Sequence, residues 1–281
     1  MDSPNRAQVE YWNEQSGPKW VQRQTALDRL LVTLGTAAMD RLHLQSGSRV
    51  LDIGCGCGDT TLELALRVGK EGAVLGADVS APMLARARER ASGVATVRFL
   101  EADVQTHRFE PPRFDAAFSR FGVMFFADPT AAFANVREAL RPGGDLSFVC
   151  WQQLAKNPWC LVPLMALAAH VQLPPPSPPG DPGPFAFDDP ERVRRILEGA
   201  GFTQVRIDEH AQRLTLGVNS VDEAAEFATE AGPTSRLLKD VPPDVKSRVF
   251  ASIREALAPF AGPDGVRLDG ACWIVTAQNP G

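Results

Sequence analysis

The sequence predicts an α/β fold in which a mostly parallel sheet carries helices on both faces. Strand-like and helix-like segments alternate from Val50 to about Trp151, with the spacing of consecutive βα units. The first of these strands runs directly into a glycine-rich loop that precedes a helix. Of the 281 residues, 44% are hydrophobic, which is enough for a sizeable core. Together these features predict a sheet buried between two layers of helices.

The core of the fold is expected to hold five strands joined by right-handed crossovers. The strands are predicted at Arg49–Ile53, Ala73–Asp78, Val97–Leu100, Phe114–Phe118 and Asp145–Trp151. The connecting helices are predicted at Thr60–Val68, from about Ala81 to Ala91 and from about Thr130 to Leu140. The turn Arg141-Pro142-Gly143-Gly144 leads into the fifth strand, because proline and glycine interrupt regular structure.

The segments on either side of this core are interpreted as covers over a site and as the rest of the sheet. Residues 1–45, with Tyr11, Trp12 and Trp20, are predicted to form a helical lid before the core at 46–153. Residues 154–189 are predicted to hold a lid helix from Asn157 to His170 and an extended, proline-rich connector from Pro174 to Pro184. Residues 190–281 are predicted to complete the sheet, with a helix at 190–201, a sixth strand at Val205–Glu209 and a last strand at Gly270–Ala277. Between these two strands, a helical insertion is predicted at about 216–265, with helices at about 221–231 and 244–259.

Charge and cysteine content narrow the class of partner. The net charge is −5 and no lysine- or arginine-rich run occurs, which argues against a nucleic-acid backbone as the main partner. Residues 1–20 lack the apolar centre of a signal peptide, and the longest apolar run, Cys160 to Ala169, is too short to span a bilayer. The five cysteines show no framework spacing, and Cys55-x-Cys57 lacks the further ligands of a metal site. We therefore expect a cytoplasmic enzyme without a metal that acts on a small molecule, while the oligomeric state stays open.

The loop after the first strand carries the strongest functional signal. It reads Asp52-Ile53-Gly54-Cys55-Gly56-Cys57-Gly58-Asp59, with glycine at every second position from Gly54. Glycine there permits positive φ angles and lets a ligand approach the backbone closely. The dinucleotide pattern G-x-G-x-x-G requires a third glycine where Asp59 stands. The loop therefore favours a nucleotide-containing ligand other than NAD, although an NAD(P)-dependent oxidoreductase is kept as an alternative.

Polar residues at the ends of successive strands extend this signal, because open parallel sheets bind ligands at the carboxyl ends of their strands. Thr60, at the start of the first helix, is placed to donate a hydrogen bond to a ligand carboxylate. Asp78 ends the second strand, where its carboxylate can accept both hydroxyls of a ribose. Asp103 and Val104 follow the third strand, where an acceptor can meet the exocyclic amine of adenine. The order of these features predicts an adenosine-containing cofactor.

The stretch from about Val50 to Trp151 resembles the core of class I S-adenosylmethionine (SAM) dependent methyltransferases, in particular the small-molecule branch that includes quinone-ring methyltransferases. The resemblance rests on the acidic residue and its G-x-G-x-G loop, on the acids that end the second and third strands, and on the turn Leu140–Gly144. It implies a Rossmann-like, seven-stranded sheet whose last strand is antiparallel, with SAM as the cofactor. Carried over position by position, the implied cofactor-binding residues are Asp52, Gly54, Gly56, Gly58, Asp78, Val79, Met83, Asp103, Val104 and Ser119, with Tyr11 and Trp20 in a lid.

The resemblance implies different roles within this set. Val79 and Met83 are expected beside the adenine, and the backbone of Ser119 beside the methionyl amine. Asp52 either contacts the ligand or orients the loop. Likewise, the aromatic residues of the N-terminal segment either close over the site or attach the N-terminus to the core.

The acceptor side is predicted from the residues that follow the fourth strand. Ser119-Arg120-Phe121-Gly122 stands where nucleic-acid amino methyltransferases have an Asn/Asp-Pro-Pro-aromatic motif. The apolar residues there are Phe121, Val123, Met124, Phe125 and Phe126, which predicts a pocket for an apolar or aromatic metabolite methylated on O, N or C. His170, His210 and Arg120 are candidate catalytic residues, each with a structural role as its alternative. A binding motif does not report turnover, so a fold repurposed as a non-methylating enzyme or regulatory scaffold is a further alternative.

Overall fold

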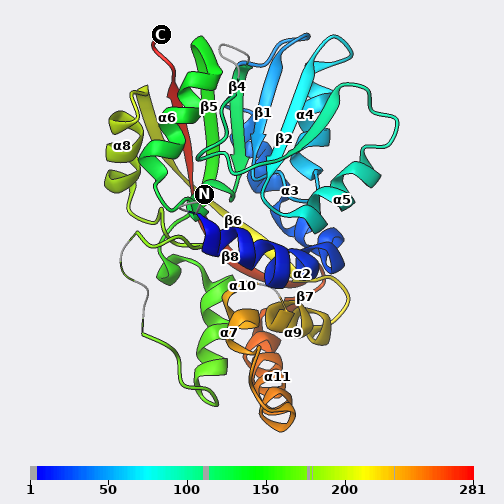
Figure 1. Cartoon of the computed structure of the whole chain (residues 1–281). Coiled ribbons are helices and arrows are strands. Elements are labelled where there is room, and N and C mark those ends of the chain that lie inside the picture. Colours follow the sequence, from blue (N-terminus) through cyan, green and yellow to red (C-terminus); the bar gives the residue numbers. More distant parts are fainter. Residues whose placement is uncertain (1–4, 110–113, 176–177, 179, 231) are drawn as a thin grey trace.

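The computed structural model describes residues 5–109, 114–175, 178, 180–230 and 232–281 (Figure 1). Within them the chain forms one sheet in the order β3-β2-β1-β4-β5-β8-β6, and the short strand β7 (Ala261–Gly262) pairs with β8. The longer strands are β1 (Arg49–Ile53), β2 (Ala73–Asp78), β3 (Val97–Glu101), β4 (Phe114–Arg120), β5 (Leu140–Trp151), β6 (Thr203–Gly217) and β8 (Gly265–Gln278).

The directions of the strands match the predicted fold class. β1 to β5 run parallel to one another, and β8 runs antiparallel to both β5 and β6. The predicted mostly parallel sheet with an antiparallel last strand is confirmed, with β7 as an additional short strand. The strand order reverses at β1, whose neighbours are β2 and β4. At such a point the loops after neighbouring strands diverge and leave a crevice at the carboxyl edge of the sheet.

Helices cover both faces of this sheet. Ser147 and Phe148 are consecutive residues of β5 and therefore point to opposite faces. The Ser147 hydroxyl donates to the carbonyl oxygen of Ala38 in α3 at 2.7 Å, whereas the Phe148 ring stacks on Phe133 of α6 with centroids 5.5 Å apart. The helices around the sheet are α3 (Gln24–Met39), α4 (Asp59–Val68), α5 (Ala81–Arg90), α6 (Pro129–Ala139) and α8 (Pro190–Gly199). The prediction of helices on both faces is confirmed.

The sixth and the last strands are much longer than predicted. β6 and β8 stay paired from Thr203 opposite Gln278 to Gly217 opposite Val266, far beyond the predicted strands at Val205–Glu209 and Gly270–Ala277. The outer halves of the two strands satisfy each other's backbone groups. Local patterns do not reveal this pairing, because the partners are distant in sequence.

The predicted turn at Arg141–Gly144 takes the form of a bulge in β5. Leu140 pairs with Phe114, whereas Asp145 already pairs with Ala116, so the residues between them are out of register. β5 therefore begins at Leu140, before the turn, whereas the predicted strand begins after it, at Asp145.

A group of helices lies beyond the extended ends of β6 and β8, at the bottom of Figure 1. They are α7 (Pro158–Ala168), α9 (Val221–Glu230), α10 (Gly232–Leu237) and α11 (Pro243–Leu257). α11 packs on α7 and α9, and the buried residues Val249, Ile253 and Leu257 form its contact face. Part of the predicted connector Pro174–Pro184, at 176, 177 and 179, falls outside the described residues. In the described part of the chain, no helix is both long and apolar enough to cross a membrane.

The N-terminal segment divides into two parts. The first consists of α1 (Arg6–Tyr11), the π-helical turn η1 (Trp12–Ser16) and α2 (Gly17–Gln22). Asn13 attaches it to the loop after β2, because its side chain donates to the carbonyl oxygen of Val79 at 2.8 Å and accepts the N–H of Ala81 at 2.9 Å. The Ser80 hydroxyl donates to the carbonyl oxygen of Trp12 at 2.9 Å. The second part, α3, packs against β4, β5 and α4 as a layer of the fold.

Candidate functional site

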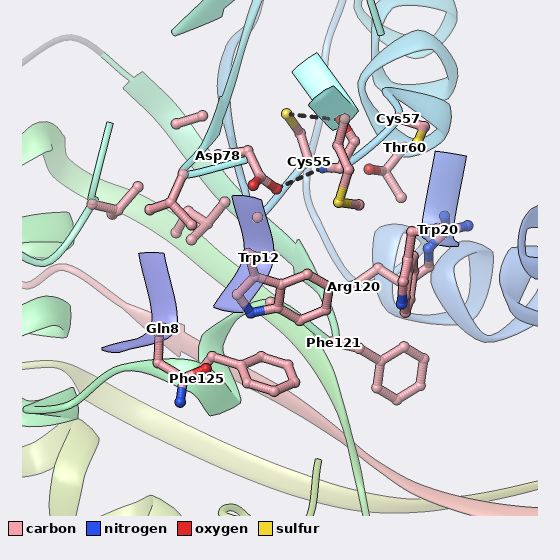
Figure 2. A pocket seen from close by; sticks show the side chains of 18 of the residues that line it. Gln8, Trp12, Trp20, Cys55, Cys57, Thr60, Asp78, Arg120, Phe121 and Phe125 are labelled. Carbon is pink, nitrogen blue, oxygen red and sulfur yellow. Dashed lines mark hydrogen bonds between the residues drawn. The ribbon is translucent and has the colours of Figure 1, made fainter. Parts of the chain in front are cut away.

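A cavity lies at the carboxyl ends of the strands, beneath the N-terminal helices (Figure 2). Its walls come from the loop after β1, the ends of β2 and β3, the loop after β4, and η1, α2 and α3. The lining residues that were predicted from sequence are Gly54, Gly56, Thr60, Asp78, Val79, Met83, Asp103, Val104, Arg120 and Trp20. The predicted residues outside the lining are Asp52, Gly58, Ser119, Tyr11, His170 and His210. The strand ends nearest the reversal of strand order thus meet in one space.

The three glycines of the loop after β1 have different surroundings. Each has a positive φ, 66° at Gly54, 53° at Gly56 and 82° at Gly58. A Cβ at Gly54 would lie 2.8 Å from the Cα of Gly122, so this glycine lets the loops after β1 and β4 touch. A Cβ at Gly58 would lie 3.0 Å from the Cβ of Ala87 in α5. Gly58 therefore serves helix packing, whereas Gly54 and Gly56 shape the cavity.

Asp78 ends β2 with its carboxylate in the cavity wall (Figure 2). Its two oxygens accept the backbone N–H groups of Gly56, at 2.8 Å, and Ser80, at 2.9 Å. Burial raises the pKa of this carboxyl, and the backbone hydrogen bonds oppose the shift. A carboxylate offers about four lone-pair sites, so acceptor capacity is left for the hydroxyls of a ribose. Asp78 thereby links the glycine loop to the position predicted for the ribose.

The end of β3 brings Asp103 and Val104 to the same cavity. One carboxylate oxygen of Asp103 accepts the backbone N–H of Gln105 at 3.0 Å, which orients the side chain in the turn after the strand. Val104, Val79 and Met83 add apolar surface to the lining. A carboxylate acceptor beside apolar side chains suits the edge and faces of an adenine ring.

Asp52 is buried behind the loop and does not line the cavity. One of its carboxylate oxygens accepts the hydroxyls of Thr60, at 2.7 Å, and Thr61, at 2.6 Å. The single hydroxyl hydrogen of Thr60 is used in this contact. Thr60 also lines the cavity, and its predicted hydrogen bond to a ligand carboxylate stays a prediction. Of the two roles left open for Asp52, this geometry supports orientation of the loop and of the start of α4.

The buried position of Asp52 predicts a pH-dependent stability. Burial raises the pKa of Asp52 to about 6, against the opposing hydrogen bonds from the two threonines. The folded protein therefore holds a proton at Asp52 that the unfolded chain releases, and the stability contributed by this group falls as the pH rises toward 6. Relative to Asp52→Asn, the unfolding free energy of the wild type should increase by roughly 1 kcal/mol between pH 7 and pH 5. Denaturant unfolding of both proteins measures this, and a constant difference would contradict the raised pKa.

Ser119 is buried at the end of β4 and joins this strand to β1. Its hydroxyl donates to the carbonyl oxygen of Ile53 at 2.8 Å and accepts the N–H of Gly122 at 3.2 Å. The cavity lining begins at the next residue, Arg120. Ser119 therefore holds the two loops together, and its predicted contact with the methionyl amine stays a prediction.

Aromatic rings from separate parts of the sequence surround the cavity (Figure 2). Trp12 makes edge contacts with Trp20 and with Phe125, with ring centroids 5.7 Å and 5.1 Å apart. Phe121 has a φ of 58°, and its ring stacks on Trp151 at 4.2 Å. A positive φ is uncommon outside glycine, and here it turns the Phe121 ring onto this stack at the cavity wall. The predicted apolar surface after β4 is thus joined by rings from the N-terminal segment.

Three predicted residues make contacts elsewhere. The guanidinium of Arg236 lies 4.7 Å from the ring centre of Tyr11, which attaches the N-terminal segment to α10. The Nε2 of His170 is 2.7 Å from the hydroxyl of Ser252, which joins the end of α7 to α11. His210 lies on β6 within its pairing to β8. No histidine of the described chain lines the cavity, so the geometry does not support a catalytic role for His170 or His210.

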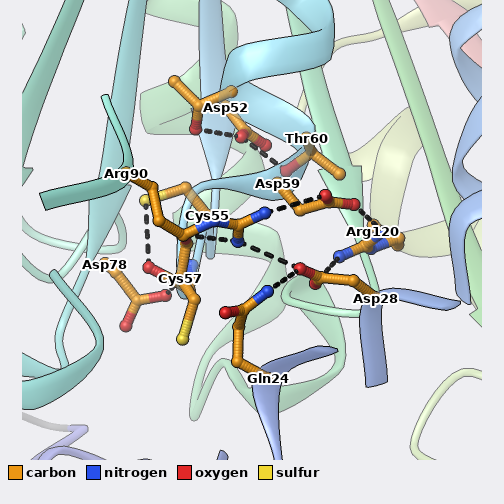
Figure 3. A network of polar contacts seen from close by, with 12 residues as sticks. Gln24, Asp28, Asp52, Cys55, Cys57, Asp59, Thr60, Asp78, Arg90 and Arg120 are labelled. Carbon is orange, nitrogen blue, oxygen red and sulfur yellow. Dashed lines mark hydrogen bonds and ion pairs between the residues drawn. The ribbon is translucent and has the colours of Figure 1, made fainter. Parts of the chain in front are cut away.

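Four charged side chains form a closed network beside the cavity (Figure 3). Arg90 pairs with Asp28 at 3.0 Å and with Asp59 at 3.2 Å. Arg120 pairs with the same two carboxylates, with Asp59 at 2.8 Å and with Asp28 at 3.4 Å. The network joins α3, α4, α5 and the end of β4 with no net charge. Asp59, which breaks the dinucleotide pattern, is therefore an ion-pair partner in this fold.

Sequence reasoning missed the contribution of α3 to the lining. Gln24, Leu27 and Asp28 reach the cavity from this helix, and the Gln24 side chain donates to the Asp28 carboxylate. Their spacing places them on one face of a helix, which is a signal present in the sequence. The direction of that face depends on how α3 packs against the sheet.

The described residues contain no group of three or more His, Cys, Asp or Glu that could hold a metal ion. Cys55 and Cys57 are buried free thiols in the loop after β1. Burial raises the pKa of Cys57 to about 12, so its thiol is neutral at physiological pH. Both cysteines act as small apolar fillers of the loop.

Comparison with known proteins provides an independent line of evidence. A family model described as a methyltransferase domain matches residues 50–144, which include the glycine loop, Asp78 and Asp103. The chain is 31% identical to 2-phytyl-1,4-naphtoquinone methyltransferase of Thermosynechococcus vestitus over 180 residues, 60% of this chain and 78% of the relative. It is 32% identical to aklanonic acid methyltransferase DauC of Streptomyces sp. strain C5 over 133 residues, 45% of this chain and 60% of that relative.

A solved structure extends the similarity to the whole fold. Phosphoethanolamine N-methyltransferase 2 of Haemonchus contortus, in complex with phosphomonomethylethanolamine and S-adenosylhomocysteine, superposes with a TM-score of 0.61. The match covers all of this chain and 61% of that one, at 18% identity. At this identity the likeness shows a shared fold.

Proposed function

Since this chain belongs to the class I SAM-dependent methyltransferases, we propose that it transfers the methyl group of SAM to an O, N or C atom of a small apolar or aromatic metabolite. The cavity at the strand ends carries this proposal. Its lining combines a glycine loop and two carboxylates suited to adenosine with a set of aromatic rings (Figure 2). The first group is suited to the cofactor, and the second to an acceptor that is itself apolar.

The residues of the cavity fit SAM. Asp78 would receive the ribose hydroxyls and Asp103 the adenine amine, with Val79 and Met83 against the ring. The loops after β1 and β4, which touch at Gly54, would lie under the methionyl chain. All of these groups line one cavity, so they can hold a single extended ligand at once.

SAM supplies a methyl group that is already activated on a sulfonium. The protein then has to orient the acceptor and exclude water, and alignment alone can lower a barrier by roughly 7–11 kcal/mol in the best cases. Trp12, Phe121 and Phe125 offer apolar surface for the exclusion of water, and aromatic faces stabilise a nearby cation. Because no histidine of the described chain lines the cavity, we expect an acceptor atom that ionises readily, such as the oxygen of a hydroquinone or acidic phenol.

The names of the two curated relatives support an acceptor with a ring. One is a 2-phytyl-1,4-naphtoquinone methyltransferase and the other an aklanonic acid methyltransferase. Aromatic rings in a cavity wall favour a planar acceptor through stacking and edge contacts.

The proposal also places the protein in the cytoplasm, because its five cysteines are free thiols. It does not include nucleic acid as a substrate, because the net charge of the chain is −5.

Calorimetric titration of the ligand-free protein with SAM, S-adenosylhomocysteine, NADH and NADPH tests the cofactor. We expect binding of the first two alone, and binding of a nicotinamide cofactor instead would overturn the proposal. Formation of S-adenosylhomocysteine is then followed with a panel of hydroquinones and phenols, and with phosphoethanolamine as the polar control. Turnover with ring acceptors supports the proposed class, whereas turnover with phosphoethanolamine alone, or with no member of the panel, contradicts it.

A further inference from the structure

We propose that Asp28 and Arg120 bind the amino acid end of SAM, Arg120 through the ligand carboxylate and Asp28 through the ligand ammonium group. This inference rests on the proposed function, and it adds two binding residues outside the glycine loop. Neither residue belongs to the G-x-G-x-G pattern, and Asp28 lies on α3, before the first strand.

The positions of the two residues point to this end of the cofactor. Asp78 and Asp103 suit adenosine, and both lie on one side of β1, where Asp78 ends β2 and Asp103 follows β3. Arg120 ends β4 on the other side of β1, and Asp28 lines the cavity from α3. Figure 2 shows Asp78 and Arg120 on different sides of the cavity. A ligand held at Asp78 by its ribose therefore extends across the glycine loop toward Arg120.

The charged network gives these two residues free capacity toward a ligand (Figure 3). Asp28 and Arg120 line the cavity, whereas Asp59 and Arg90 do not. The contact between Asp28 and Arg120, at 3.4 Å, is the longest of the four ion pairs. A guanidinium has five N–H donors, and the pairs of Arg120 with Asp59 and Asp28 use two of them. The remaining donors suit a carboxylate, which guanidinium groups bind with good geometry.

The charge balance of the network favours a zwitterion. Burial and the nearby Asp59 carboxylate raise the pKa of Asp28, against the opposing arginines. A ligand ammonium group beside Asp28 would stabilise its ionised form. A carboxylate on the same ligand would meet Arg120 in turn. An amino acid group brings no net charge, so the network stays neutral when it binds.

The test compares two ligands that share an adenosine and a thioether. In S-adenosylhomocysteine the sulfur carries a chain that ends in the amino acid group. In 5′-methylthioadenosine the same sulfur carries only a methyl group. Loss of a charge-assisted contact should weaken S-adenosylhomocysteine binding about tenfold to a hundredfold in Asp28→Asn and in Arg120→Gln. The affinity for 5′-methylthioadenosine should change less than about twofold, since its contacts are untouched. Calorimetric titration of each variant gives both constants, and Arg120→Lys, which keeps the charge, should recover part of the loss.

Asp59→Asn and Arg90→Gln are the matched controls. Each removes a charge from the same ion-pair network, but neither residue lines the cavity. We expect them to lower the melting temperature and to keep the preference for S-adenosylhomocysteine. The inference is overturned if the controls lose that preference as strongly as Arg120→Gln, or if the cavity variants weaken both ligands equally. A wild type that binds neither ligand would refute the proposed function, whereas a wild type that binds both with equal affinity would refute only this inference.

Discussion

Asp78→Ala is expected to weaken SAM binding by at least about a hundredfold in a protein that still folds. The carboxylate would accept the ribose hydroxyls, and charge-assisted hydrogen bonds of this kind contribute about 1.5–3 kcal/mol each. It also accepts the N–H of Gly56 at 2.8 Å, so its loss releases the glycine loop that forms the cavity. Calorimetric titration with SAM, alongside the melting temperature of the variant, measures both effects.

Glu101→Ala is the control for this prediction. Glu101 ends β3 directly opposite Asp78 in the register, but its side chain is exposed and does not line the cavity. Removing a carboxylate there should leave SAM affinity within about twofold, because exposed charges contribute little. Equal affinity of Asp78→Ala and the wild type would show that the ribose lies elsewhere.

Gly54→Ala is expected to lower the unfolding free energy by roughly 2–4 kcal/mol and to abolish SAM binding at micromolar protein concentrations. A φ of 66° costs a residue with a side chain about 1–2 kcal/mol. The new Cβ would also lie 2.8 Å from the Cα of Gly122, and backbone in the loop after β4 cannot rotate away as a side chain can. The two loops would separate and widen the floor of the cavity. Denaturant unfolding and calorimetry test the two parts of this expectation.

Gly143→Ala separates the cost of the backbone angle from the cost of the contact. Gly143 has a φ of 75°, and a Cβ there would meet nothing within 4 Å. We therefore expect about 1–2 kcal/mol of destabilisation and unchanged SAM affinity. If both variants are equally stable and both bind SAM, the close approach of the two loops at Gly54 does not shape the site.

The strands of the core and their order along the chain could be predicted because their signals are local. β1 (Arg49–Ile53) and β2 (Ala73–Asp78) have the predicted bounds, since each is a short apolar run between residues that interrupt regular structure. β6 (Thr203–Gly217) could not be bounded in this way, because its outer half is defined by pairing with β8 rather than by its own pattern.

Within the site, the residues at the strand ends could be predicted, because the carboxyl ends of parallel strands all lie at one edge of the sheet. Asp78, Asp103 and Arg120 accordingly line one cavity. The hydrogen bond from the Thr60 hydroxyl to the buried Asp52, at 2.7 Å, could not be predicted, because no local pattern shows which way this hydroxyl points. His210 illustrates the same limit, since its place in β6 became clear only with the pairing of that strand.

The sequence by itself therefore determined the class of fold and the cofactor-binding edge of the sheet. The period of the hydrophobic pattern, the spacing of the glycines and the acidic residues at the strand ends are all properties of short segments, so they can be read without the fold. The tertiary structure alone decided which side chains from other segments complete the site. Asp28 reaches the cavity only because α3 packs against the sheet, and Trp12 only because Asn13 attaches its helix to the loop after β2. Such contacts join residues far apart in the chain, and their geometry follows from packing rather than from any local pattern.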